Sequence, residues 1–239
     1  TKGADMPALY GRSFSVVELN YTWYQMVRVE SVARMVERAP ANLRFAAKLT
    51  RTMTHEREGD LREQVQRYRQ GIKPLGDRLL AVLVQLPPDF DRSTANRRYL
   101  ATLLDGLQGL PTAVEFRHAS WAVDSVFAEL QRRSVSLVTV DEPDLPDLFP
   151  TLDVVTNPEL FYVRFHGRND RGWRSSNMQQ KFNYDYSEAE LADWRERWLE
   201  RLAVQAGKGL LFFNNHVNGR APQNGKSLLK LLESSAIGG

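Results

Sequence analysis

The chain has 239 residues, of which 42% are hydrophobic, and its 32 Lys and Arg residues against 29 Asp and Glu residues leave a formal net charge of +3. A balance so close to neutral excludes a protein devoted wholly to polyanions, although 25 of the basic residues are arginine, which leaves local anion recognition open. The lack of cysteine excludes disulfides, thiolate nucleophiles and cysteine metal sites. No apolar stretch is long enough for a membrane span and no signal-like segment opens the chain, so we expect a cytoplasmic protein.

Short apolar runs alternate with amphipathic stretches along the whole chain. Their length and their Val, Leu and Phe content are typical of strands that are covered on both faces, as in parallel sheets. The expected strands cover residues 14–19, 43–47, 79–86, 112–116, 135–140, 161–165 and 210–213. Between them, apolar residues recur at the spacing of helices.

Three local features of the second half of the chain are predicted from its sequence. The longest helix is expected from about residue 187 to 206, with Leu191, Trp194, Trp198 and Leu202 on one stripe and a capping box of Ser187 and Glu190 at its start. The proline-rich stretch 141–150 is expected to be an irregular loop, and residues 234–239 a flexible tail.

Seven βα units in succession predict a TIM-type (β/α) barrel that forms a single domain over residues 1–239. The alternative, a doubly wound open sheet, would place a glycine-rich phosphate-binding turn after the first strand. The residues that follow this strand, 19–22, have no glycine. The length of the chain also favours a barrel, because such barrels typically have about 250 residues.

Polar side chains gather where the expected strands end. In a parallel barrel the loops after the strands converge at one rim, where active sites are built. The candidate site residues are Glu18, Asn20, Lys48, His55, Gln85, Glu115, Arg117, His118, Asp141, Arg164, His166, Arg168, Trp173, Asn214 and Asn215. Because side chains alternate across a strand, we expect shared faces, directed into the barrel, for Glu18 with Asn20, Glu115 with Arg117, Arg164 with His166, and Asn214 with His216.

Two features of the last third of the chain favour an anionic ligand. The long loop 167–183 carries Arg168, Arg171, Trp173, Arg174 and Lys181, whose side chains suit phosphate oxygens and the face of a base or sugar. A solvated mobile loop is the alternative. After the last strand, Asn224 is expected to cap a short helix whose N-terminus would offer free N–H groups to a phosphate.

Two other interpretations of the same residues stay open. The charged groups at the rim could be a network of ion pairs that closes the core, because buried charges persist only when they are paired. Alternatively, Glu18, Glu115, Asp141 and His166 could hold a divalent metal, although Lys48, Arg117 and Arg164 would compete for the carboxylates.

Six motifs in the chain resemble, in order, the signature of the YecE-like family, also called domain of unknown function 72. They are residues 17–24 (VELNYTWY), 45–48 (FAAK) with Thr54 and His55, 85–88 (QLPP) with Phe90, 115–118 (EFRH) with Ser120 and Trp121, 162–168 (YVRFHGR) and 213–215 (FNN). The resemblance covers about residues 9 to 232. It implies a TIM-type barrel, similar in architecture to the endonuclease IV and xylose isomerase group, and it implies no settled activity.

The start of the chain departs from that family. Members open with a strand that bears a Gly-[Thr/Cys]-Ser-Gly-Trp type motif and a loop with Phe-Tyr-Pro, and residues 1–8 contain neither. Only the end of the following helix is expected, around Leu9 and Tyr10. We therefore expect a natural protein longer by about 20–30 residues, one βα unit, and a chain here that lacks the family's first strand.

The leading hypothesis is a protein whose rim binds an anionic, phosphate-bearing ligand, with nucleic acid or a nucleotide favoured over a free sugar phosphate. If it is catalytic, phosphoester hydrolysis is expected, with Arg117 and Arg164 stabilising charge and His166 or Glu115 as general acid or base. The alternatives are a metal-dependent isomerase or hydrolase acting on a carbohydrate and a non-catalytic interaction module. No cofactor is firmly implied, no membrane partner is expected, and the sequence names no protein partner.

Overall fold

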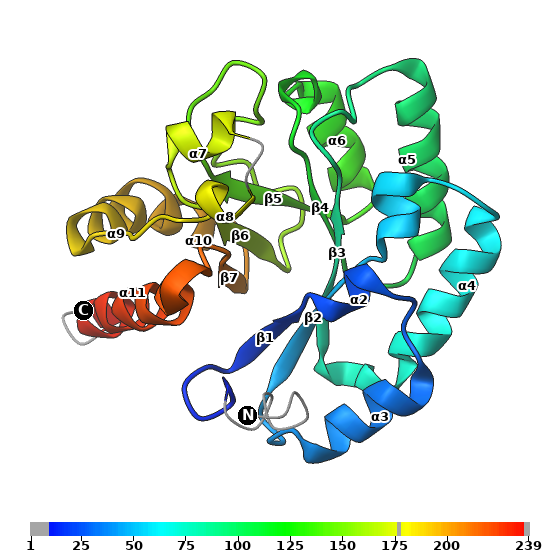
Figure 1. Ribbon diagram of the computed structural model, residues 1–239, viewed down its shortest axis with the longest axis horizontal. Coiled ribbons are helices and arrows are strands. Elements are labelled where there is room, and N and C mark those ends of the chain that lie inside the picture. The colour runs from blue at the N-terminus through cyan, green and yellow to red at the C-terminus, as the bar shows by residue number, and fades with distance from the viewer. Residues whose placement is uncertain (1–9, 176–177, 237–239) are drawn as a thin grey trace. The chain divides into compact units, whose positions relative to one another are not determined.

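The computed structural model describes residues 10–175 and 178–236, which form two compact units, Thr1–Trp121 and Ala122–Gly239. Each unit is built from parallel strands followed by helices (Figure 1). Of the helix end predicted around Leu9 and Tyr10, Leu9 lies outside the described residues, and Tyr10 is helical. The prediction of a single domain stays a prediction.

The first unit contains four strands, β1 to β4. Its elements are β1 (Val16–Leu19), α2 (Tyr21–Tyr24), α3 (Val29–Arg38), β2 (Arg44–Lys48), the π-turn η2 (Thr52–Glu56), α4 (Leu61–Ile72), η3 (Lys73–Arg78), β3 (Leu79–Gln85), α5 (Thr94–Leu107), β4 (Thr112–Glu115) and η4 (Ala119–Trp121). The strands pair in parallel in the order β1, β2, β3, β4. Helices α3, α4 and α5 follow one another along the outer side of these strands (Figure 1).

The register of the first unit brings the carboxyl ends of β2, β3 and β4 together. Lys48 pairs with Leu83, and Gln85 pairs with Glu115. The middle residues of β2, β3 and β4 are buried, whereas those of β1 are half-buried. Lys48 and Gln85, the last residues of β2 and β3, are half-buried polar side chains.

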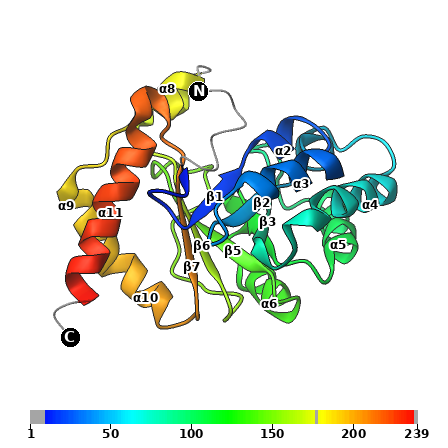
Figure 2. The same ribbon diagram turned by 90° about the horizontal axis from the view of Figure 1, so that it is seen from below.

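The second unit contains three strands, β5 to β7. Its elements are α6 (Asp124–Arg132), β5 (Ser136–Asp141), β6 (Phe161–Phe165), α7 (Asp170–Arg174), α8 (Met178–Lys181), α9 (Glu188–Trp194), the π-turn η5 (Arg195–Leu199), α10 (Glu200–Ala203), β7 (Gly209–Phe213), η6 (Val217–Gly219) and α11 (Arg220–Ala236). The strands pair in parallel in the order β5, β6, β7. Figure 2 shows α11 beside α9.

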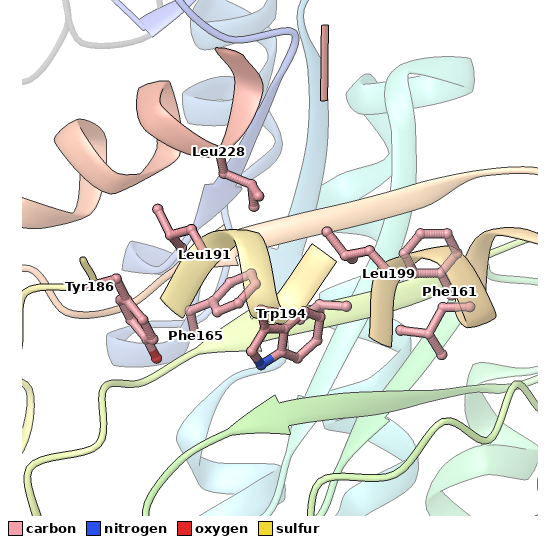
Figure 3. Packing of buried hydrophobic residues seen from close by; sticks show 9 residues of the cluster. Phe161, Phe165, Tyr186, Leu191, Trp194, Leu199 and Leu228 are labelled. Carbon is pink, nitrogen blue, oxygen red and sulfur yellow. The ribbon is translucent and has the colours of Figure 1, made fainter. Parts of the chain in front are cut away.

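An aromatic cluster covers the helix-facing side of β6 and β7 (Figure 3). Phe165 stacks on Phe213 with ring centroids 4.4 Å apart, and its edge meets Trp194. Leu191 and Leu202 are fully buried in the same cluster. Full burial of one such side chain contributes about 1.5–3 kcal/mol. This face fixes the direction of β6, so that the neighbouring residues Arg164 and His166 point to the other side.

The long helix is present and starts with the predicted capping box of Ser187 and Glu190. Its predicted apolar stripe is wrong at one position, because the π-turn η5 inserts an extra residue into the helical repeat. Leu199 is therefore buried in the cluster in place of Trp198, which only packs partly against it. Regular helix ends at Ala203, earlier than predicted.

The predicted loop at 141–150 is confirmed, because β5 ends at Asp141 and no helix follows before β6. The predicted tail at 234–239 is wrong for residues 234–236, which continue α11, and residues 237–239 lie outside the described part. No helix among the described residues is long and apolar enough to cross a membrane.

Candidate functional site

The predicted site residues lie at the ends of strands or just after them in both units. The first unit holds Glu18, Asn20, Lys48, His55, Gln85, Glu115, Arg117 and His118, and the second unit holds Asp141, Arg164, His166, Arg168, Trp173, Asn214 and Asn215. Each group forms contacts of its own.

A hydroxyl network fixes the strand ends of the first unit. The Oγ1 atom of Thr22 lies 2.6 Å from the carbonyl oxygens of both Leu19 and Lys48. Thr50 donates to the carbonyl of Thr22, and the buried hydroxyl of Tyr68 lies 3.2 Å from the carbonyl of Lys48. Helix α2 is therefore held against the end of β2, which places Trp23 beside Lys48.

Lys48 is half-buried between a neutral acceptor and an aromatic face. Its Nζ atom donates to Gln85 Oε1 at 2.6 Å and lies 5.0 Å from the centre of the Trp23 ring. The negative face of an indole attracts a cation at this range. The side chain is thereby held in one place, with its charge at the ends of β2 and β3.

His55 lies on the π-turn η2 and contacts two polar side chains. Its Nδ1 atom lies 2.9 Å from Thr54 Oγ1 and accepts from Trp23 Nε1 at 3.4 Å. An Nδ1 that accepts hydrogen bonds leaves the proton of the neutral ring on Nε2. The ring is half-buried, and its Nε2–H is thus a hydrogen-bond donor to whatever lies beyond it.

Positive potential surrounds the His55 ring. Its pKa is lowered to about 4, first by burial, then by the charge of Lys48, while Asp89 opposes this and Arg117 and Arg57 add to it. The cations disfavour a further positive charge on the ring. His55 is therefore neutral at physiological pH, at a point where several cations favour a negative charge.

Glu115 and Arg117 form a buried ion pair. Arg117 Nε donates to Glu115 Oε1 at 2.5 Å, and the two side chains are 5% and 0% exposed. The shared face predicted for them is consistent with this contact. The pair matches the interpretation of the rim as a structural network, because a buried carboxylate needs such a partner.

His118 has a local structural role. Its Nδ1 atom lies 2.8 Å from Ser120 Oγ and accepts from the Ser120 N–H at 3.2 Å. The hydroxyl of Ser120 in turn accepts from the backbone N–H of Arg92. The ring therefore caps the short turn η4 and ties it to the loop after β3.

The shared face predicted for Glu18 and Asn20 required β1 to continue through Asn20, and it does not. β1 stops at Leu19, and Asn20 has helical backbone angles at the start of α2. The same holds for Asn214 and His216, because β7 stops at Phe213 and His216 also has helical angles. In both places the chain takes up helical angles soon after the strand, so the two-residue alternation stops there.

In the second unit, Asp141 binds Arg168 through two hydrogen bonds. Arg168 Nε and Nη2 donate to Asp141 Oδ1 and Oδ2 at 2.8 and 2.7 Å. Burial raises the pKa of the Asp141 carboxyl and the bonds from Arg168 oppose the rise, while the same bonds raise the pKa of the guanidinium. The bidentate geometry is one that an anionic ligand would otherwise use.

Arg164 and His166 lie on the inner side of β6 and just after it. Arg164 is 1% exposed and His166 is 0% exposed. The Nδ1 atom of His166 lies 3.2 Å from Asn214 Nδ2, and the rings of Trp173 and Phe182 flank the imidazole. His166 is thus sealed among protein groups.

The segment 167–183 contains two short helices, α7 and α8, where the sequence predicted a long loop. Asn169 caps α7 by accepting from Gly172 N–H, and its amide donates to the carbonyl of Gln180. Lys181 Nζ lies 3.9 Å from the centre of the Trp173 ring. One face of the indole that was predicted to stack on a ligand is therefore covered by a side chain of this segment.

The predicted cap at Asn224 is wrong. Helix α11 begins at Arg220, and Asn224 lies in its second turn with a buried side chain. Its Oδ1 accepts from Asn215 Nδ2 at 2.7 Å, and its amide donates to the carbonyl of Tyr186. The two asparagines fasten α11 to the loop before α9, so their polar groups serve packing.

Sequence reasoning overlooked Trp23 and Tyr24 as site residues. Trp23 contacts Lys48 and His55, and Tyr24 is 70% exposed beside it. A detectable signal was present, because two aromatic residues directly follow the polar end of the first strand. Among the described residues, no group of three or more His, Asp or Glu side chains is placed to hold a metal ion.

The chain was compared with known proteins. Residues 1–237 match a family model described as protein of unknown function DUF72. UPF0759 protein YunF of Bacillus subtilis is 28% identical over 94% of this chain and 85% of its own length.

Two solved structures of this kind are also similar to the chain. A DUF72 family protein of Thermotoga maritima is 32% identical, with a TM-score of 0.87 over 98% of this chain and 91% of that one. One from Enterococcus faecalis is 29% identical, with a TM-score of 0.85 over 98% and 95% of the two chains. The predicted fold class, a TIM-type barrel with seven βα strands described here, is confirmed.

Proposed function

Since the chain belongs to the DUF72 family, whose name assigns no reaction, we propose from the site itself that it binds an anionic, phosphate-bearing ligand at the strand ends of the first unit. The binding cluster consists of Trp23, Lys48, His55 and Gln85. The observation that carries the proposal is geometric: the ammonium group of Lys48, 2.6 Å from Gln85 Oε1 and 5.0 Å from the centre of the Trp23 ring, contacts the same indole as the half-buried His55 ring.

The chemistry of the binding cluster suits phosphate oxygens. Lys48 offers an ammonium group that is held in place, and His55 offers a neutral N–H donor. Positive potential in a partly desolvated site acts more strongly on a ligand than it would in water. A bound phosphate would accept hydrogen bonds from both donors. Its negative charge would also offset the mutual repulsion of the clustered cations.

The proposal is binding without hydrolysis. Glu115 and His166, the predicted acid and base, are 0% exposed. Arg117 donates to Glu115 Oε1, and Asn214 Nδ2 lies within hydrogen-bond distance of His166 Nδ1. A general acid or base has to reach the proton that it transfers. His55 is accessible, but a pKa of about 4 makes it a weak base at neutral pH.

Nothing in the described residues favours the metal-dependent alternative. Of its four predicted ligands, Glu115 is bound to Arg117, and Asp141 is bound to Arg168. The charged groups of the second unit fit the other interpretation of the rim, a structural network of ion pairs. We therefore assign them no ligand.

The test is titration of the protein with inorganic pyrophosphate at about 50 and 200 mM salt. We expect affinity that falls with salt and a loss of about 10- to 100-fold in Lys48→Gln, because hydrogen bonds to charged groups contribute about 1.5–3 kcal/mol. Lys73→Gln is the matched control: it makes the same change at an exposed lysine that precedes β3 and lies away from the strand ends. Absence of salt-dependent binding, or an equal effect of both variants, would contradict the proposal.

A further inference from the structure

An exposed aromatic side chain lies next to the binding cluster. Tyr24 is 70% exposed, although large aromatic side chains usually bury most of their surface. Its ring centre lies 4.9 Å from that of Trp23, at an angle of 86°. The two rings therefore meet edge to face, and most of the Tyr24 surface remains open to solvent.

The position of Tyr24 is fixed by its neighbours. Helix α2 is anchored through Thr22, whose side chain is fully buried against the ends of β1 and β2. Trp23 is held in turn by its contacts with His55 and Lys48. The exposed ring is therefore presented on a rigid support, which reduces the conformational entropy that a ligand would lose on binding to it.

We propose that the ligand of the binding cluster carries a nucleobase, which stacks on Tyr24 while its phosphate is bound by Lys48 and His55. This inference rests on the proposed function and adds the chemical class of the ligand. A positioned cation next to an exposed aromatic ring is a combination that recognises single-stranded nucleic acid and nucleotides. A sugar phosphate or pyrophosphate would leave the Tyr24 ring unused.

Stacking and charge make separable contributions to affinity. Stacking of a base on an aromatic ring is worth about 5- to 150-fold in affinity, from about 1–3 kcal/mol per base. It requires a ring at position 24 and needs no hydroxyl group there. The phosphate contact requires the charge of Lys48 and is common to every phosphate ligand.

The experiment compares four probes: inorganic pyrophosphate, thymidine triphosphate, an octamer of deoxythymidylate, and an abasic octamer of the same charge. We expect the base-bearing probe of each pair to bind about 5- to 150-fold more tightly than its partner without a base. Tyr24→Leu should abolish that difference, Tyr24→Phe should keep it, and Lys48→Gln should weaken all four probes. The comparison of the triphosphate with the octamer identifies which source of nucleobase is preferred.

Two controls keep the outcome interpretable. Val204→Ser removes another highly exposed apolar side chain, 85% exposed in the second unit, and should change no affinity. In Trp23→Phe, quenching of tryptophan fluorescence by thymidine triphosphate should decrease, which reports the base at this place independently of Tyr24. Equal binding of probes with and without a base, with Tyr24→Leu unchanged, would overturn the inference while leaving anion binding intact. No binding of pyrophosphate would overturn the proposed function itself.

Discussion

The strand ends of the two units carry the same kinds of residue and use them differently. In the second unit, Asp141 takes both hydrogen bonds of Arg168, and His166 is fully buried against Asn214. In the first unit, Glu115 and Arg117 form a buried pair. Lys48 and His55 are half-buried: Lys48 donates to Gln85, and His55 contacts Trp23.

The difference shows how charged residues at a strand end come to serve either stability or binding. A carboxylate within reach neutralises a cation and uses its donors, so the pair becomes part of the core. The ammonium group of Lys48 is positioned by an amide and an indole ring. The pKa of its neighbour His55 is lowered first by burial and then by this charge.

The largest effect is expected from removing the cation of a buried pair. Arg117→Met leaves the Glu115 carboxylate buried and should reduce the free energy of unfolding by about 3–5 kcal/mol. Arg168→Met should cost less, about 1–3 kcal/mol, because Arg168 is 34% exposed and water screens the pair. Urea unfolding of both variants measures the two values.

A double variant tests the cause of that effect. Glu115→Gln with Arg117→Met removes both charges and should recover part of the lost stability. A loss in Arg117→Met that is below 1 kcal/mol, or equal losses in the two single variants, would mean that the two pairs are not distinguished by their burial.

A smaller effect is expected on acidification. The pKa of His55 in the folded protein, about 4, lies below the ordinary value of 6.5, so the unfolded chain takes up a proton first as the pH falls. The stability that the neutral ring contributes is complete above pH 6.5 and is lost as the pH falls from 6.5 to about 4. We expect a loss of about 1–2 kcal/mol, less than full burial would give, because solvent screens a half-buried ring.

The measurement is unfolding of the wild type and His55→Gln between pH 7.5 and 4, whose difference isolates this one ring. NMR titration of the ring gives its pKa directly. Bound pyrophosphate should raise that pKa, because an anion favours the charged imidazolium. An unchanged difference between the two proteins over this range would refute the positive potential that the proposed function requires.

Strand positions could be predicted because burial on both faces leaves a clear mark in the sequence. All seven strands lie within two residues of the apolar runs. The faces of Asn20 and His216 could not be predicted, since both residues adopt helical angles where the alternation was extended through them. Trp198 was assigned to the buried stripe because no local sequence pattern predicts a π-turn.

The candidate site could be located by sequence but its charges could not be paired. Arg168 and Asp141 are 27 positions apart, and only the parallel pairing of β5 with β6 brings them together. The pKa of His55 is likewise lowered first by burial and then by Lys48, and Arg117, which follows β4, adds to this. Which cations meet a carboxylate is a property of the fold, and this decides which strand ends we assign to a ligand.

The smallest expected effect is the most informative for the comparison. Lys48→Gln removes a half-buried cation whose hydrogen-bond acceptor is the neutral Gln85, so no carboxylate of that contact is left behind. We expect the free energy of unfolding to stay within about 1 kcal/mol of the wild type, as for exposed charges. The pKa of His55 should rise toward 6.5, because its second-largest downward influence is gone. Urea unfolding and NMR titration test both expectations on one sample. A loss of stability as large as that of Arg117→Met would place Lys48 among the structural charges, and the first unit would then resemble the second.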